Sequence, residues 1–328
     1  MSTVTTTTLS AEMKTFYDMR LIDEASPMLV HEQFGQKRPI PQGGGKTVNF
    51  RRFSPLAKAT TALTEGVTPS GSSLSVSSIS AIVAQYGDYV VQSDVLELTA
   101  VDNTILETTK LLGRQAGLTM DTIVRNALLL GTNKSYAPKY VADTNGNLVE
   151  TEVTKTADLD TSAKITVDVV QRVVAKLRAQ NAPTIGGDYV CIIHPYVAYD
   201  LMRDPEWIDA HKYATPENLY TGEIGKMAGV RFVQSTEAKI DKGGSDNPSG
   251  LAVFHCLFIG DGAYGVTEVT GGGLQTIVKQ KGSSGTADPL DQRSSVGWKG
   301  LKAAKILVDN YLVDLMCCSK FSATATAN

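Results

Sequence analysis

Two glycine-containing segments resemble phosphate-binding loops and offer the clearest prospect of chemistry. Gly45-Lys46-Thr47 matches the end of a P-loop, but Ile40 occupies the position where that motif requires its first glycine. Gly260–Gly265 fits the dinucleotide pattern G-x-G-x-x-G after an apolar segment. A dinucleotide site also needs a helix that starts inside the motif, whereas residues 266–269 are mostly β-branched and lead into a glycine triplet. We therefore expect a strand-to-strand turn. A nucleotide-dependent enzyme using Gly260–Gly265 remains an alternative.

Metal-binding and nucleophilic patterns are weaker still. His31-Glu32 begins like the zinc motif H-E-x-x-H, but Gly35 stands where the second histidine belongs. Cys191 and His194 are three residues apart, a spacing that puts them on opposite faces of a strand. The segment from Asp143 to Glu150 resembles a calcium loop with its glycine misplaced, and a tight turn is the better interpretation. We predict no catalytic residue, no metal ion, no cofactor and no enzymatic activity.

The composition excludes several classes of partner. The 328 residues are 42% hydrophobic, which predicts a folded protein with a sizeable core. Lys and Arg total 31 against 34 Asp and Glu, so the net charge of -3 gives no general attraction to nucleic acid or anionic lipid. The start has no signal-peptide pattern, and the apolar stretches are shorter than the ~20 residues that span a bilayer. Four cysteines in apolar surroundings favour reduced thiols and folding in the cytoplasm.

The first third of the chain predicts an arm, a hairpin and a loop without a core. Residues 1–45 are interpreted as an N-terminal arm. Side chains alternate from Lys46 to Phe53, which predicts a half-buried strand, and a return strand is expected from about Ser73 to Ser93. Residues 54–72 between them are too poor in large apolar side chains to form a core, so they need an external surface. A mobile surface loop fits the composition equally well.

The rest of the chain predicts a long helix and an α/β lobe. An apolar stripe between Thr104 and Gly131 indicates a helical spine, and Gly113 and Gly117 within it predict a second backbone packed closely on that face. A hairpin is expected around residues 143–147. From Thr166 onward, helices and buried strands alternate. Residues 295–298 and 303–315 are expected to be strands that pack back on the spine.

Six segments together resemble major capsid proteins of tailed bacteriophages, in order and over nearly the whole chain from about Lys46 to Phe321. They are Gly45–Arg52, Leu63–Pro69, Gln85–Val90, Gly229–Val233, Asp288–Arg293 and Val296–Lys299. The resemblance implies an α+β fold of the Hong Kong ninety-seven capsid type. It divides the chain into an N-terminal arm (1–45), an extended β-hairpin loop (46–93), a peripheral domain with the spine helix (94–164 and 286–321), an axial α/β domain (165–285) and a C-terminal tail (322–328).

This resemblance implies that the chain self-assembles, as hexamers and pentamers, into the icosahedral shell around a double-stranded DNA genome. It would be assembled in the host bacterial cytoplasm and reside in the virion, with portal and possible decoration proteins as partners. Because only about 45 residues precede the extended loop, a separate scaffolding protein is expected. Contact with DNA should be weak and independent of sequence, and no membrane contact is expected. Candidate intersubunit contacts are Arg51, Arg52, Lys58 and Glu65. An encapsulin-type nanocompartment shell is the alternative within this fold.

Overall fold

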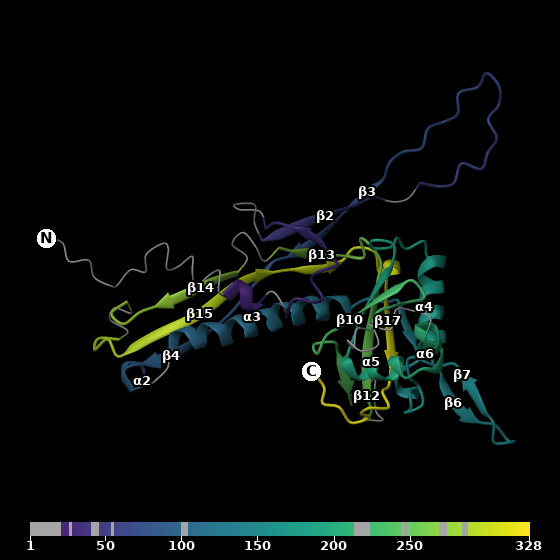
Figure 1. Ribbon diagram of the computed structural model, residues 1–328. Helices are drawn as coiled ribbons and strands as arrows, with labels where there is room; N and C mark the ends of the chain where they lie inside the picture. The colour runs from purple at the N-terminus through teal and green to yellow at the C-terminus, as the bar shows by residue number, and fades with distance from the viewer. Residues whose placement is uncertain are drawn as a thin grey trace.

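The computed structural model describes residues 21–25, 28–40, 46–53, 56–99, 104–212, 224–243, 247, 250–268, 274–283 and 288–328. Figure 1 shows an elongated part built on a long helix, an α/β lobe at one end of it, and a long loop that leaves the body on its own. Among the described residues, no helix has both the length and the apolar character needed to cross a lipid bilayer.

The lobe is organised around a seven-stranded mixed sheet. Its strand order is β5 (Lys134–Tyr136), β17 (Leu312–Cys317), β12 (Ala252–Ile259), β8 (Tyr189–Ile193), β10 (Val230–Gln234) and β9 (Lys226–Met227), with β11 (Ile240–Lys242) paired to β12. All residues of β8, β12 and β17 are buried. Their sequences are apolar apart from His255 and Asp314, which suits strands that are covered on both faces.

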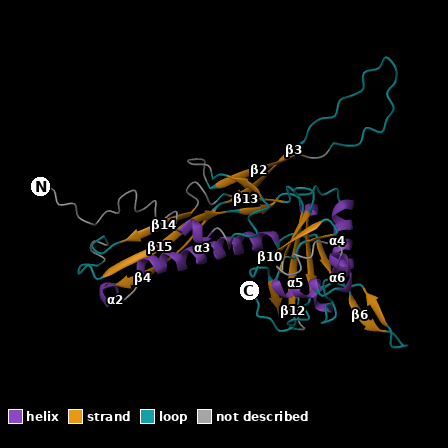
Figure 2. Cartoon of the chain, in the orientation of Figure 1, coloured by secondary structure: helices purple, strands orange, loops and turns teal. Residues whose placement is uncertain are grey.

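Three helices accompany this sheet: α4 (Val167–Ala179), α5 (Pro195–Met202) and α6 (Pro205–Lys212) (Figure 2). The Thr166 hydroxyl accepts a hydrogen bond from the Val169 N–H and caps α4, whose apolar face is buried. Pro195 occupies the first turn of α5, where its missing N–H leaves no donor unpaired. The helix, strand and helix predicted after Thr166 are therefore confirmed.

The elongated part is built on helix α3 (Thr104–Leu128), the predicted spine. It packs against β15 (Arg293–Lys302), which pairs with β14 (Leu274–Lys279) and β4 (Ala84–Ser93) in a three-stranded sheet; α2 (Asp94–Thr99) follows β4. The helical residues 21–25 lie against the glycines of α3, and a Cβ on Gly117 would come within 2.6 Å of the Ala25 carbonyl oxygen. The predicted close approach of a second backbone is confirmed.

A second three-stranded sheet joins the N-terminal segment to the core. It contains β1 (Gln36–Arg38), β13 (Tyr264–Thr267) and β16 (Ala304–Ile306). Buried polar contacts hold the same segment: His31 Nδ1 lies 2.6 Å from Asp121 Oδ2 on α3, and Glu32 Oε2 lies 2.5 Å from Lys302 Nζ on β15. These residues of the expected arm are therefore part of the folded core.

Two separate hairpins and two short 3-10 turns complete the described elements. β2 (Thr47–Phe53) pairs with β3 (Val76–Ile82), and β6 (Lys139–Ala142) pairs with β7 (Leu148–Thr151). The 3-10 turns are Thr156–Asp158 and Asp309–Tyr311. The Asp143 carboxylate accepts hydrogen bonds from the backbone N–H groups of Asn145 and Asn147, so the predicted tight turn is confirmed.

Strand pairing corrects the expected return strand, and it crosses the expected domain boundaries in two further places. The return strand of the first hairpin ends at Ile82, and β4 (residues 84–93) pairs instead with β15. β17 and β5, expected in the peripheral parts 286–321 and 94–164, belong to the seven-stranded sheet. β13 and β14, expected in the axial part 165–285, pair with strands outside it. The chain crosses repeatedly between the two parts, and such non-local pairings leave no local signature in the sequence.

Candidate intersubunit surfaces

The loop between β2 and β3 has no support from its own chain. Every residue from 56 to 75 is exposed, including Leu56, Leu63, Val67 and Leu74, and Leu63 is 77% exposed. Figure 1 shows the loop extending beyond the body as an open excursion. Apolar side chains held in water over this length indicate a surface that another molecule covers.

The root of the loop is anchored firmly. Phe50 is fully buried and, with Val48, packs on a cluster that includes Leu307 and Val308. The Phe50 ring lies directly over Gly265 of β13, where a Cβ would overlap the ring carbons. Only glycine permits this contact. The base of the hairpin is therefore fixed in direction, whereas its tip stands free.

The four residues predicted to make intersubunit contacts fall into two groups. Arg51 is exposed on the face of β2 opposite Phe50, while Arg52 is half-buried and its Nη1 donates to the Leu307 carbonyl at 3.4 Å. Lys58 and Glu65 lie farther out on the exposed loop, where Glu65 precedes Gly66 in a turn with a positive φ of 77°. The structure thus brings Arg51 and Arg52 together at the root and leaves Lys58 and Glu65 apart from them. Their contacts with a second subunit stay a prediction.

Sequence reasoning missed a second exposed apolar region at the far end of the elongated part. It comprises Tyr89, Val90 and Val91 on β4, Val95, Leu96 and Leu98 on α2, and Ile277 on β14. A signal was present, because the apolar residues 89–91 are consecutive and cannot all face one side of a strand.

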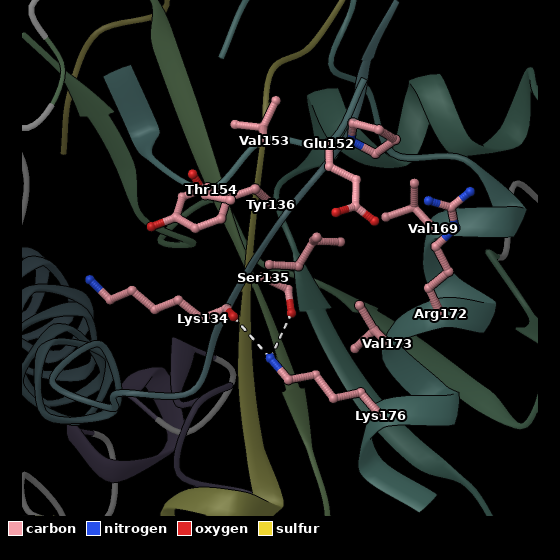
Figure 3. Close-up of a pocket in the computed structure, with 12 residues that line it drawn as sticks. Lys134, Ser135, Tyr136, Glu152, Val153, Thr154, Val169, Arg172, Val173 and Lys176 are labelled. Carbon is pink, nitrogen blue, oxygen red and sulfur yellow. Dashed lines mark hydrogen bonds between the residues drawn. The ribbon is translucent and has the colours of Figure 1, made fainter. Parts of the chain in front are cut away.

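A pocket of about 430 Å³ lies between α4, β5 and the segment after β7 (Figure 3). Lys176 Nζ donates to the Lys134 carbonyl at 2.9 Å and to Ser135 Oγ at 3.0 Å. Burial lowers the pKa of Lys176. Arg172, also at the pocket, forms ion pairs with Glu150 of β7 and Asp168 of α4. These contacts fix the root of the β6–β7 hairpin to the lobe.

A partly buried charge cluster lies on the seven-stranded sheet. His255 Nδ1 lies 2.9 Å from Asp314 Oδ2, and His255 Nε2 lies 2.9 Å from Asp241 Oδ2. Burial alone would lower the pKa of His255, but the two carboxylates outweigh it and raise that pKa to about 9. The hydrogen bond from His255 lowers the pKa of Asp241 to about 2. The arrangement is an ion-paired triad that joins β11, β12 and β17.

The cysteines are free and buried in the same lobe. Cys256 Sγ and Cys317 Sγ are 3.8 Å apart and are not bonded. Burial raises the pKa of the Cys191 thiol well above its usual value and that of Cys318 to about 12. The thiols are therefore protonated at neutral pH and serve as packing groups.

The motifs considered for chemistry occupy structural positions. Residues 260–263 form the turn from β12 into β13, and β13 is a strand where a dinucleotide site requires a helix. A Cβ on Gly260 would come within 2.8 Å of the Pro183 carbonyl oxygen, so this glycine serves packing. A nucleotide site at Gly260–Gly265 is therefore contradicted. Gly45 lies outside the described residues. His194 caps α5, and within the described ranges no cluster of His, Cys, Asp and Glu is arranged to hold a metal ion.

Comparisons with known proteins agree with this architecture. A family model described as phage capsid protein matches residues 54–312. The capsid of Ralstonia phage GP4 is 17% identical with a TM-score of 0.65, over 88% of this chain and 87% of that one. The cyanophage Pam1 capsid is 13% identical with a TM-score of 0.62, over 99% and 97%. The head of Helicobacter pylori bacteriophage KHP40 is 14% identical with a TM-score of 0.63, over 86% and 88%. No curated protein matches the sequence.

Proposed function

Because the chain belongs to the phage capsid protein family, we propose that copies of it close into an icosahedral shell by laying the loop between β2 and β3 on a neighbouring copy. Its function is that of a major capsid protein with the Hong Kong ninety-seven type of fold, and its place is the virion. The proposal concerns the means of closure. Hexamers and pentamers are the expected building units.

One observation carries this proposal: the loop has a rigid root and an unsupported tip. Phe50 is fully buried over Gly265, whereas residues 56–75 are exposed throughout. An isolated loop of this length would lose conformational entropy on ordering without a compensating burial. A neighbouring copy supplies the apolar surface for Leu56, Leu63, Val67 and Leu74, and the same contact is repeated at every equivalent position of a shell.

The content of the shell and its assembly partners are part of the same proposal. We propose double-stranded DNA as the content, with weak and sequence-independent contact because the net charge is -3. A separate scaffolding protein, a portal and possible decoration proteins would act during assembly in the bacterial cytoplasm. Nuclease-protected DNA in purified particles is the expected finding, whereas an enclosed enzyme would favour the nanocompartment alternative.

The test is to replace residues 56–75 with a short Gly-Ser turn. The variant should fold, because the deleted segment contributes no buried side chain, and it should fail to close shells. Thermal unfolding measures the first outcome, and electron microscopy with sedimentation measures the second.

A matched control keeps the length of the loop and changes Leu56, Leu63, Val67 and Leu74 to Ser. It should reproduce the assembly defect if apolar contact drives closure. Normal shells from the shortened protein would show that the loop is only a surface loop, and a failure to fold would show that it belongs to the core.

A further inference from the structure

A concentration of positive charge surrounds the root of the long loop. We call it the basic surface and define it by six residues from three elements and one flanking position: Lys37, Arg38, Lys46, Arg51, Arg52 and Lys305. β1 and β16 flank β13, with Gln36 and Lys305 both opposite Gly265 in register. Phe50 of β2 covers that same glycine, so the three strands that carry these cations meet at one point, with Arg51 on the face of β2 that is turned away from Gly265.

The basic surface has almost no negative charge of its own. Glu268 is the one acidic residue in the segments 36–38, 46–53, 264–268 and 304–306. Within the described part of the chain, none of the six cations forms an ion pair: the nearby Glu32 is buried against Lys302, and Arg52 donates to a backbone carbonyl. Like charges gathered in this way repel one another, so the surface calls for an acidic partner.

A matching acidic segment occurs on the opposite side of the chain. Residues 139–160 contain five carboxylates against Lys139 and Lys155. We call the β6–β7 hairpin and its continuation to residue 160 the acidic arm. Glu150 is paired with Arg172, whereas Glu152 and Asp158 are exposed and have no ion pair within the described residues.

The acidic arm also exposes apolar side chains. Tyr140, Val141, Leu148 and Val149 are all solvent-exposed, and they lie on both faces of the two-stranded ribbon. A two-stranded hairpin is marginally stable in water unless another surface covers it. Figure 1 shows the hairpin leaving the lobe, away from the rest of the chain.

The two charged regions cannot meet within one molecule. In Figure 1, β6 and β7 lie at the lower edge of the lobe, whereas β2 and β13 lie on the upper side of the elongated part. We propose that the acidic arm of one copy docks on the basic surface of the next. Such a contact joins different patches of identical subunits, and repeated contacts of this kind form a ring when the rotation between copies closes. The proposal rests on the proposed self-assembly and is independent of the loop contact.

A second copy fits the basic surface better than DNA does. Each copy of the chain carries one acidic arm and one basic surface. Every basic surface in an assembly therefore has one arm of complementary charge available to it. DNA offers no role for the exposed apolar residues of the arm, and its phosphates repel the arm's carboxylates. Complementary charge across an interface sets register and encounter rate, which a ring of identical subunits requires.

Charge reversal tests the contact. One variant carries Lys37→Glu, Arg51→Glu and Lys305→Glu; another carries Glu152→Lys and Asp158→Lys; a third combines all five changes. Arg52, Glu150 and Asp143 are left unchanged because they have partners within the chain. Each separate set should raise the protein concentration needed for assembly on the order of tenfold, and the combined variant should recover most of the loss. High salt should weaken assembly of the unmodified protein.

A control separates the contact from net charge. Arg178→Glu, Lys299→Glu and Lys320→Glu reverse three exposed cations outside the basic surface and should leave assembly unchanged. Thermal unfolding must show that every variant is folded; for a set that unfolds, single reversals at Arg51 and Glu152 replace it.

Each outcome decides the matter. Normal assembly of both separate sets, while the unmodified protein forms shells, overturns this contact and leaves the proposed function intact. Loss of packaged DNA without loss of shells in the basic set alone would assign the basic surface to the genome and also overturn it. Failure of the unmodified protein to assemble under any condition would instead contradict the proposed function.

Discussion

The strand β12 and the long loop after β2 are opposites in how they use apolar residues. All eight residues of β12 are buried in the middle of the seven-stranded sheet. Residues 56–75 are all exposed although they include four large aliphatic side chains. Stability of the subunit therefore resides in the sheet, and the apolar residues of the loop are available to other molecules. The same residue types serve folding in one region and association in the other.

The largest effect is expected in the sheet. Phe258 is fully buried in β12, and Phe258→Ala should lower the free energy of unfolding by about 3–5 kcal/mol. Chemical denaturation of the unassembled subunit measures the change. If the variant keeps its stability, the seven-stranded sheet is not the main source of the subunit's stability, and the proposed difference between β12 and the long loop is wrong.

The ion-paired triad makes the stability of the sheet depend on pH. The folded-state pKa of His255 is raised to about 9 from 6.5, so its contribution is complete below about pH 6.5 and is lost as the pH rises through 9. The contribution near neutral pH is about 2–3 kcal/mol. Unfolding measured between pH 6 and 10 should show this loss, and Asp241→Asn should reduce it. A stability that is constant across this range would contradict the ion pairing.

Gly265 lies where the root of the long loop packs on the core. A substitution there should have an intermediate effect on the free energy of unfolding. Gly265→Ala places a methyl group inside the Phe50 ring and should cost about 1–3 kcal/mol. The loop should also lose its direction, so assembly should fall more than stability does. Combining this change with Phe50→Leu should restore part of both. Thermal unfolding and sedimentation of the two variants check these outcomes, and equal losses in the single and double variants would argue against the contact.

The smallest effect on stability is expected in the loop. Leu63→Ser removes an apolar side chain that is 77% exposed and should change the free energy of unfolding by less than about 0.5 kcal/mol. Shell yield should nevertheless fall. A loss of shell yield without a loss of stability in Leu63→Ser would support the difference between the loop and the sheet. Equal losses of stability in Leu63→Ser and Phe258→Ala would contradict it.

The sequence predicted the elements whose signals are local. The alternation of helices and buried strands after Thr166 and the tight turn at Asp143 each depend on a few neighbouring residues, and each is confirmed. The close approach at Gly113 and Gly117 was predictable because glycine is unfavourable within a helix unless it has a packing role.

Partners far apart in the chain were not predictable. Nothing in residues 84–93 specifies that they pair with 293–302 and not with β2. The strand that contains Asp314 was expected to pack on the spine, and its place in the seven-stranded sheet was not predictable because the buried partner of Asp314, His255, is 59 residues away. At the candidate surfaces, the sequence located the coreless loop and Arg51 with Arg52. It did not reveal that the strands carrying Lys37, Arg38 and Lys305 lie beside β2.

The strand order also governs when the subunit can be completed during synthesis. β17 lies between β5 and β12, yet it is made after both of them. The cluster that holds Phe50 likewise includes Ala303, Leu307 and Val308 from the last part of the chain. A nascent chain on the ribosome thus lacks both an interior strand of its sheet and the anchor of its assembly loop until translation is nearly finished. Limited proteolysis of ribosome-bound chains should show protection only after residue 317 has emerged. The strand order therefore delays association until the synthesis of each subunit is complete.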